Sequence, residues 1–331
     1  MNNVKVGMLS FAHMHAFSYF DSLIDRDDVT IVGISDEDAD RVRGLIDQYK
    51  ISYFKDYKDL LKTDADIIII NSENAFHAEH TIASANAKKH VMCEKPLGTS
   101  MEDMKDMIQA CKDNKVQLMT AFPNRYVPSI VEAKDLIDKG ELGELIAIKA
   151  TNKGAMPGGW FVNNDLSGGG AMLDHSVHVA DILNWILSSE IEEVYAENGT
   201  LFYKELTLED SAMITMKFKN GVLATLDTSW SRTEPYPYKR DLTMHFVGTE
   251  GTLFIDYFKQ ISEVYSKELN HAEWSYWGDN KDELLVDDLI ERFKNGKEVP
   301  ITGEDGLASG KISLAAYESV KKIEVIKFDK D

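Results

Sequence analysis

Short apolar runs alternate with amphipathic stretches over residues 1–122. Each apolar run has the length of a strand, and the apolar residues of each amphipathic stretch recur with helical spacing. Strands that alternate with helices predict right-handed βαβ units, and runs that are apolar at successive positions suit a parallel sheet with helices on both faces. We therefore expect an α/β, doubly wound Rossmann domain over residues 1–122. The expected strands are Val4–Phe11, Val29–Ser35, Ala65–Asn71, His90–Glu94 and Val116–Ala121, and the expected helices are His15–Asp25, Ala39–Tyr49, Asp56–Lys62, Ala75–Ala87 and Ser100–Asn114.

Beyond residue 122 the pattern changes to hairpins with helices before and after them. Asn220-Gly221 separates two apolar runs and is the strongest short-range hairpin signal, and residues 248–251 mark a second turn. No Pro/Gly-rich linker separates the two regions. We therefore expect a second domain over residues 123–331, of the α+β class with a large, mostly antiparallel open sheet. Its expected strands are Ala212–Lys219, Val222–Trp230, Leu242–Val247, Thr252–Asp256 and Ile261–Tyr265, and its expected helices are Pro128–Asp138, Leu173–Ser188, Lys281–Phe293 and Glu304–Val325.

The chain is strongly acidic, with 36 Lys and Arg against 56 Asp and Glu in 331 residues and a formal net charge of −20 at pH 7. Nonspecific nucleic-acid binding and docking on anionic lipid both rely on basic side chains, so we expect neither partner. The two cysteines, Cys93 and Cys111, are too few for a disulfide framework or a multi-cysteine metal site. The N-terminal pattern is not that of a secretory signal, and the longest aliphatic run, Ile67–Ile70, is far too short to span a bilayer. We expect a cytoplasmic protein.

The first strand–helix junction is where a Rossmann domain holds the pyrophosphate of a dinucleotide, on glycines that allow a tight turn and close approach. Ser10, Ala12 and His15 stand at the three glycine places. Small residues at the first two places still let backbone amides reach an anion beside a helix N-terminus. Two interpretations stay open at this point: a dinucleotide site with an altered loop, and a Rossmann-like domain that binds no dinucleotide.

Asp36 ends the second predicted strand, 26 residues after Ser10. A carboxylate at this place accepts hydrogen bonds from the ribose hydroxyls of adenosine and repels a 2′-phosphate. It favours NAD over NADP, if a cofactor binds. The alternative is that Asp36 only caps the following helix.

Asp174 and His178 lie four residues apart in a predicted helix, so their side chains share one face. A carboxylate beside an imidazole raises its basicity and orients it, which suits a general base for alcohol oxidation. The alternative is a hydrogen-bonded pair on the helix surface. Lys95 precedes Pro96, and such a lysine is by itself usually a solvated surface residue.

Glu94-Lys95-Pro96 and Asp174-x-x-x-His178 occur together at a separation in the chain that is strongly specific for one protein family. With other segments in the same order, they resemble the Gfo/Idh/MocA oxidoreductases, named for glucose–fructose oxidoreductase and inositol dehydrogenase. The resemblance covers nearly the whole chain. The other segments are 74–77, 124–128, 140–143, 168–181 and 304–307.

The resemblance implies NAD as cofactor, with NADP less favoured, and hydride transfer between the nicotinamide and a hydroxyl or carbonyl of a sugar, cyclitol or similar polyol. It implies a catalytic set in which His178, oriented by Asp174, removes the hydroxyl proton and Lys95 stabilises the alkoxide-like transition state. A homodimer or homotetramer is implied as well. The implied cofactor residues are Ser10, Phe11, Ala12, His13 and Met14 at the pyrophosphate, Asp36 and Arg41 at the adenosine, Ser72, Asn74 and His77 at the nicotinamide half, and Glu94 and Lys95 at its ribose and ring, while Tyr126 and Trp160 are implied as walls of the substrate cleft.

The chain departs from the family pattern outside the glycine loop as well. Glu73 stands where proline is usual, and Ser176 replaces the glycine between Asp174 and His178, where we expect its hydroxyl to contact substrate. Three histidine pairs have spacings that can chelate a metal, but we prefer separate capping and substrate-contact roles and predict no metal. The pairs are His13/His15, His77/His80 and His175/His178.

Two other functions stay open beside the dehydrogenase. One is a glycosidase or lyase that retains NAD and cleaves its substrate by transient oxidation, and the other is a cofactor-free binding or regulatory homologue. For a dehydrogenase, the substrate class is constrained by residues 141–200, which hold nine acidic side chains and only Lys149 and Lys153 as cations. We therefore expect a neutral polyol rather than an anionic sugar acid.

Overall fold

The computed structural model describes residues 3–236, 240–257, 261–266, 271–276 and 280–328. The chain divides into two compact units, each described here by itself. The break after Pro123 lies next to the boundary expected between residues 122 and 123, and two later segments, 165–168 and 281–310, also group with the first unit. Unit 1 comprises Met1–Pro123, Asp165–Gly168 and Lys281–Gly310, and unit 2 comprises Asn124–Asn164, Gly169–Asn280 and Lys311–Asp331.

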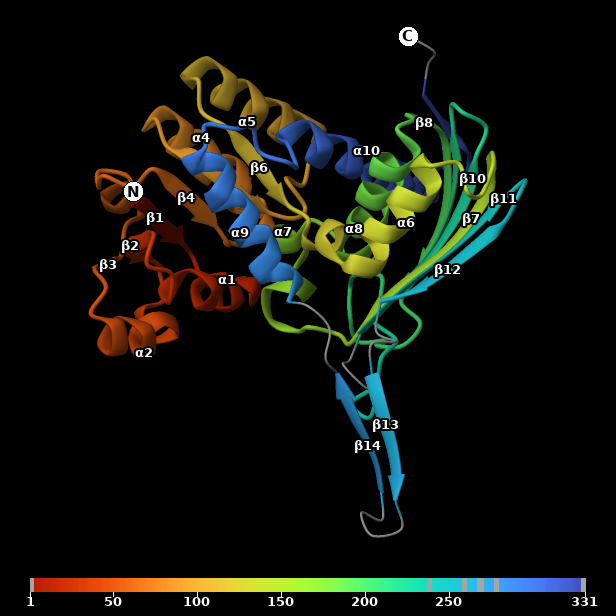
Figure 1. The fold of residues 1–331 in the computed structure, drawn as a ribbon, viewed down its shortest axis with the longest axis horizontal. Coiled ribbons are helices and arrows are strands. Elements are labelled where there is room, and N and C mark those ends of the chain that lie inside the picture. The colour runs from red at the N-terminus through yellow and green to blue at the C-terminus, as the bar shows by residue number, and fades with distance from the viewer. Residues whose placement is uncertain (1–2, 237–239, 258–260, 267–270, 277–279, 329–331) are drawn as a thin grey trace. The chain divides into compact units, whose positions relative to one another are not determined.

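Unit 1 is built on a six-stranded sheet in the order β3-β2-β1-β4-β5-β6, in which every neighbouring pair is parallel (Figure 1). Strand β4 is buried at all four of its positions, as expected for an inner strand covered on both faces. The expected α/β, doubly wound Rossmann domain is therefore confirmed. The strands are β1 Val4–Leu9, β2 Val29–Ser35, β3 Tyr53–Phe54, β4 Ile67–Ile70, β5 His90–Glu94 and β6 Leu118–Ala121.

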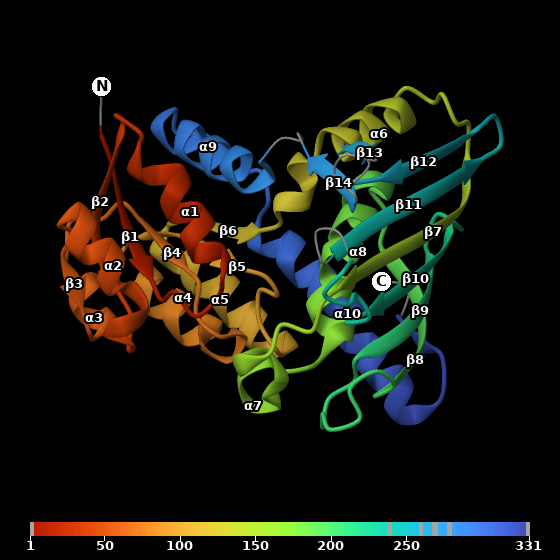
Figure 2. The same cartoon turned by 90° about the horizontal axis from the view of Figure 1, so that it is seen from below.

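Helices connect these strands, and a late helix of the chain joins them. Ser100 caps the N-terminus of the α5 helix, since its side chain accepts a hydrogen bond from the Asp103 amide at 3.1 Å. The α9 helix follows unit 2 in the chain but packs beside α1 (Figure 2), because its apolar face is buried there. Ser18 on α1 donates to Asp282 on α9 at 3.0 Å. The helices are α1 His15–Ile24, α2 Ala39–Tyr49, α3 Tyr57–Leu60, η1 Asn74–Phe76 (a 3₁₀ turn), α4 His77–Asn86, α5 Met101–Asn114 and α9 Lys281–Lys294.

Unit 2 is built on a seven-stranded sheet in the order β12-β11-β7-β10-β9-β8-β15. Its neighbouring pairs are antiparallel, except β7 and β10, which are parallel. The β9–β10 hairpin turns at Asn220-Gly221, where Gly221 has a φ of +88° that favours glycine. The expected α+β fold with a mostly antiparallel open sheet is confirmed. The strands are β7 Leu145–Gly154, β8 Ile191–Gly199, β9 Ser211–Phe218, β10 Leu223–Ser229, β11 Arg240–Gly248, β12 Thr252–Asp256 and β15 Ile326–Lys327, with a separate pair β13 Ile261–Ser266 and β14 His271–Tyr276.

Helices pack on one face of the seven-stranded sheet and form the core of unit 2 with it (Figure 1). Val179, Ile182 and Leu183 of α8 are buried in this core with strand residues such as Ile214. This packing fixes the orientation of α8, which carries Asp174 and His178. The remaining helical segments are η2 Pro123–Tyr126, α6 Pro128–Asp138, η3 Gly159–Val162, α7 Asn164–Ser167, α8 Ala171–Leu187 and α10 Gly303–Lys322.

None of the described helices has the length and apolarity to cross a bilayer.

Candidate functional site

A pocket of about 860 Å³ lies in unit 1 at the carboxyl ends of β1, β2 and β4, where doubly wound sheets bind their ligands. Four of the predicted cofactor residues line it: Ser10, Asp36, Arg41 and Ser72. Seven carboxylates, Asp36 among them, line the pocket, against the cations of Arg41 and Lys55. A phosphate monoester carries close to two negative charges at pH 7, so this lining favours hydroxyl groups over such a phosphate.

Asp36 is fixed in this pocket by three contacts with its own unit. Its Oδ2 accepts the amide of Phe11 at 2.7 Å, its Oδ1 accepts the amide of Asp38 at 2.8 Å, and Nη1 of Arg41 lies 3.0 Å from Oδ1. The cap of α2 is a different residue, Asp38, whose side chain accepts the Asp40 amide at 3.1 Å. The helix-cap alternative for Asp36 is therefore wrong, and its carboxylate instead joins the first loop to Arg41.

The loop between β1 and α1 is held by its own hydrogen bonds. Ser10 has a φ of 67°, the left-handed conformation that glycine adopts most readily, and its Oγ accepts the Ala12 amide at 3.1 Å. The His13 amide donates to the carbonyl of Asn71 at 2.9 Å, and the His15 amide donates to Nδ1 of His13 at 3.2 Å. These amides are committed within the chain, whereas a glycine loop leaves such donors for phosphate.

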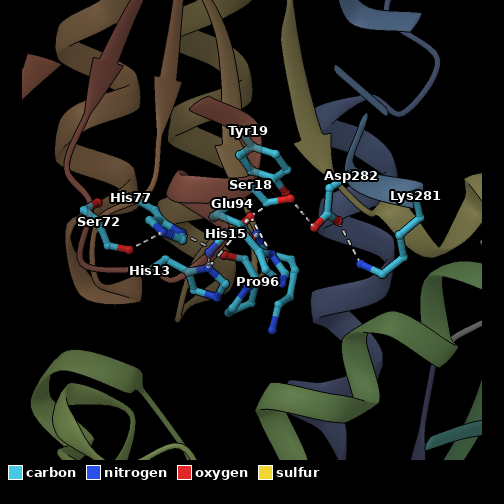
Figure 3. A network of polar contacts seen from close by, with 11 residues as sticks. His13, His15, Ser18, Tyr19, Ser72, His77, Glu94, Pro96, Lys281 and Asp282 are labelled. Atoms are coloured by element: carbon cyan, nitrogen blue, oxygen red, sulfur yellow. Dashed lines mark hydrogen bonds and ion pairs between the residues drawn. The ribbon is translucent and has the colours of Figure 1, made fainter. Parts of the chain in front are cut away.

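Glu94, the last residue of β5, is the centre of a buried polar network in unit 1 (Figure 3). It is 0% exposed, and its Oε1 accepts Tyr19 Oη at 2.6 Å and lies 3.0 Å from His15 Nδ1. Its Oε2 accepts the amide of Lys95 at 3.0 Å. Burial alone raises the pKa of Glu94, but the neighbouring charges of His13, His15 and Lys95 outweigh it and hold the pKa well below its usual range. Glu94 is therefore an ionised carboxylate inside the protein.

His77 lies behind the pocket lining. It is 0% exposed, and its ring nitrogens lie 2.8 Å from the carbonyl oxygen of Pro96 and 3.1 Å from that of Ser72. Burial lowers the pKa of His77, and burial also lowers the pKa of His80 to about 4. Nδ1 of His80 is 3.0 Å from Ser72 Oγ. His77 thus joins the segment after β4 to the segment after Lys95, and so positions residues that sequence reasoning assigned to the cofactor.

Asp174 and His178 lie one turn apart on α8, both half-buried. Oδ2 of Asp174 accepts the indole N–H of Trp230 at 3.2 Å and lies 3.7 Å from Nε2 of His175. Trp230 is fully buried, so it is a rigid support for the carboxylate. Sequence reasoning missed Trp230, because the contact joins residues 56 apart and depends on how α8 packs on the sheet.

The N-terminus of α8 is held by a second residue that the sequence did not indicate. Glu209 accepts the amides of Gly170 at 2.9 Å and Met172 at 3.0 Å, and the hydroxyl of Tyr317 at 2.7 Å. Burial raises the pKa of Glu209 despite these hydrogen bonds. A Cβ on Gly170 would come within 2.1 Å of the Glu209 carbonyl oxygen, so the glycine is needed for this close approach. Gly170, before the Asp174–His178 helix, therefore serves close packing.

The remaining predicted residues have different surroundings. Ser176 is fully buried with its Oγ 2.7 Å from Ser313 Oγ, so the expectation that it contacts substrate is wrong. Asn74 donates to the carbonyl of Ser167 at 2.8 Å, and the rings of Trp160 and Phe161 stack at 3.8 Å. Tyr126 is half-buried in η2.

Comparison with known proteins follows the same two units. Residues 4–122 match the oxidoreductase family with an NAD-binding Rossmann fold, and residues 130–254 match the GFO/IDH/MocA C-terminal domain. The uncharacterised oxidoreductase YrbE of Bacillus subtilis is 32% identical over 303 residues, which cover 88% of this chain and 86% of that protein. The chain belongs to the Gfo/Idh/MocA family of oxidoreductases.

The chain is also similar to proteins named for an activity on inositols. The myo-inositol 2-dehydrogenase of Thermotoga maritima is 28% identical over 316 residues, 92% of each chain. The crystal structure of scyllo-inositol dehydrogenase from Lactobacillus casei with bound NAD(H) and scyllo-inositol has a TM-score of 0.86 and 21% identity, and the match covers 98% of this chain and 99% of that one. This second similarity is one of fold.

Two buried amide side chains bear on whether a dinucleotide fits this Gfo/Idh/MocA Rossmann unit. Both polar atoms of the Asn71 side chain and Oδ1 of Asn74 lack a hydrogen-bond partner among the described residues, and Asn71 is 0% exposed. An unpaired buried polar group costs about 1–3 kcal/mol, so a ligand that pairs with these groups is favoured. Both residues follow β4, whose carboxyl end borders the acidic pocket. These two side chains therefore fit a nicotinamide dinucleotide, whereas the amides of the loop after β1 are already bonded within the chain.

Proposed function

We propose that this chain is an NAD-dependent oxidoreductase that transfers hydride between the nicotinamide and a CH–OH or carbonyl group of a neutral sugar, cyclitol or related polyol. The observation that carries the proposal is Asp36, fixed by Phe11 and Arg41 in the pocket where this fold receives the adenosine ribose. The inositol dehydrogenases among its relatives support the substrate class.

The proposed cofactor site uses the acidic pocket for the adenosine end. Asp36 accepts hydrogen bonds from the ribose hydroxyls, and the carboxylates around it disfavour the 2′-phosphate of NADP. When bound, the nicotinamide supplies the hydride acceptor or donor. The other proposed contacts are residues 10–14 at the pyrophosphate and Ser72, Asn74, Glu94 and Lys95 at the nicotinamide half, with His77 positioning Ser72.

In the proposed chemistry His178 is the general base that takes the hydroxyl proton of the substrate. Asp174, one turn earlier on α8 and held by Trp230, stabilises the imidazolium that forms. Lys95 donates a hydrogen bond to the substrate oxygen and stabilises its developing negative charge. Tyr126 and Trp160 are proposed to contact the substrate.

Cofactor binding is the first test, by titrating the purified protein with NADH and NADPH and following nicotinamide and tryptophan fluorescence. We expect NADH to bind at least about tenfold more tightly than NADPH, since one carboxylate–phosphate clash is worth more than about 1.4 kcal/mol. The second test is turnover of inositols and neutral sugars, which Lys95→Ala and His178→Ala should each reduce by about 10²–10⁴-fold with an unchanged Tm. Turnover restricted to sugar phosphates, or near wild-type rates in either variant, would contradict the proposal.

One observation favours a second candidate, the cofactor-free binding homologue: the amides of residues 10–13 and His15 are already bonded within the chain. If neither nucleotide binds in the fluorescence titration, this candidate replaces the dehydrogenase. If the purified protein instead retains NAD and reduces none that is added, the transient-oxidation glycosidase or lyase is favoured.

A further inference from the structure

One of the three histidine pairs lies in a donor set that sequence reasoning did not assemble. Ligand atoms of His13, His15 and Glu94 all lie within 4.8 Å of one another. Nδ1 of His15 is 3.0 Å and Nδ1 of His13 is 3.9 Å from Oε1 of Glu94. The three residues come from the loop after β1, the start of α1 and the end of β5, so the strands bring them together at one sheet edge (Figure 3).

The set is buried and held in place by its surroundings. The side chains of His13 and Glu94 are 3% and 0% exposed, and that of His15 is 15% exposed. Tyr19 and the Lys95 amide fix the two carboxylate oxygens of Glu94 by hydrogen bonds. In known metal sites, hydrogen-bond partners of this kind orient the side chains that bind the ion and strengthen metal binding. His15 is the most exposed of the three side chains and is the member that solvent reaches.

The chemistry of the donors selects a class of ion. Two imidazole nitrogens and one carboxylate oxygen suit Zn²⁺, Fe²⁺, Co²⁺ and related ions, whereas Mg²⁺ and Ca²⁺ prefer oxygen ligands alone. Nδ1 of His15 lies 3.0 Å from Oε1 of Glu94. An ion that binds both atoms replaces this contact.

We propose that His13, His15 and Glu94 form a site for a divalent first-row transition metal ion. Three protein ligands leave at least one coordination position for an exchangeable water or anion. An ion at Nδ1 of His13 would displace the hydrogen bond that this atom accepts from the His15 amide at 3.2 Å. The site shares His13 and Glu94 with the proposed cofactor contacts. Its test does not depend on the proposed function, because the metal alone is the probe.

The test is titration of the purified, metal-stripped full chain with Co²⁺, followed by its visible absorption. We expect one Co²⁺ per chain with the intense bands of four- or five-coordinate cobalt, and an affinity that falls as pH is lowered through the range in which histidine is protonated. Zn²⁺ should raise the Tm, whereas Mg²⁺ at the same concentration should not.

Variants locate the ion. His13→Ala, His15→Ala and Glu94→Gln should each weaken Co²⁺ binding at least about tenfold, whereas His245→Ala, which removes an exposed histidine of β11, should leave it unchanged. Should the variants fail to fold, electron paramagnetic resonance of Cu²⁺ in the wild-type chain should report two imidazole nitrogens. No stoichiometric Co²⁺ binding, binding unaltered in His15→Ala, or a Cu²⁺ signal without imidazole couplings would each overturn the proposal.

Discussion

At the scale of single residues, Asp36 both holds a loop in place and contributes its charge to the proposed cofactor pocket. Its carboxylate holds the loop after β1 through the Phe11 amide and also faces the pocket lining. Asp36→Asn keeps the shape but removes the charge that opposes a 2′-phosphate. We expect NADH to bind about tenfold more weakly and NADPH more tightly, so that the ratio of the two dissociation constants approaches one. Fluorescence titration of both nucleotides measures this preference.

A charge-matched control separates the local effect of Asp36 from that of the total charge. Asp47→Asn removes one carboxylate from the exposed face of α2 and should leave the preference unaltered. An unchanged preference in Asp36→Asn would remove Asp36 from cofactor selection.

Arg125 and Asp181 form a buried ion pair in unit 2. Nε and Nη2 of Arg125 donate to the two carboxylate oxygens at 2.8 and 2.6 Å, and the side chains are 7% and 1% exposed. Asp181→Ala leaves the guanidinium buried without its counter-ion, and should lower the free energy of unfolding by about 3–5 kcal/mol. Urea unfolding measures this loss. Asp138→Ala, which breaks the exposed pair with Lys134 on α6, should cost less than about 1 kcal/mol.

At the scale of elements, the docking of α9 on α1 should depend on pH through Asp282. Burial alone raises the pKa of Asp282, but Lys281, His15 and the Ser18 hydroxyl outweigh it and lower the pKa to about 2, from 3.8. A depressed carboxyl pKa contributes stability that is present above pH 3.8 and is lost as pH falls towards 2. The full contribution is about 2 kcal/mol, and roughly half of it is lost between about pH 5 and about pH 3.

Urea unfolding over this pH range, with Asp282→Asn beside the wild type, measures the contribution. The difference in unfolding free energy between the two proteins should shrink as pH falls, whereas Glu283→Gln, an exposed carboxylate of the same turn, should show a smaller change. A difference that stays constant with pH would contradict a role for the Asp282 charge.

Elements with a clean periodic pattern were predicted, and those without one were not. The strands Val29–Ser35 and His90–Glu94 and the helices Ala39–Tyr49 and Pro128–Asp138 have the expected bounds. Strands β7 and β8 were missed because their solvent-facing positions carry charges such as Lys149 and Glu192, which dilute the apolar alternation. No local pattern could place α9 in unit 1, since that depends on packing with a helix more than 250 residues earlier.

In the candidate site, too, residues that depend on local sequence were predicted and residues that depend on long-range contacts were not. Asp36 and Arg41 were predictable because they are close in sequence: Asp36 follows β2 and Arg41 lies in the first turn of α2. In the structure they form an ion pair. Trp230, Glu209 and Tyr317 were not, because each contacts α8 across a long stretch of chain. The cluster of His13, His15 and Glu94 was predictable only in part. The spacing of the two histidines is evident in the sequence, but the proximity of Glu94, at the end of β5, is not.

At the scale of the whole molecule, the net charge of −20 should weaken the binding of an anionic dinucleotide. Screening by salt reduces long-range repulsion, so NADH should bind more tightly at about 200 mM than at about 20 mM NaCl. The fluorescence titration repeated over this range measures the effect, with sucrose as a control for bulk solvent changes. Affinity that falls with added salt would mean that nearby cations dominate the acidic surroundings.

The return of α9 to the first unit sets an order of events during biosynthesis. The N-terminal half emerges from the ribosome with all six strands of its sheet, yet the surface of α1 that α9 covers stays open until residues 281–294 have followed. At ordinary rates of translation, residues 124–280 take roughly 10–30 s to synthesise. During that interval the face of α1 that α9 contacts in the folded chain is open, and it is a natural place for a chaperone to bind.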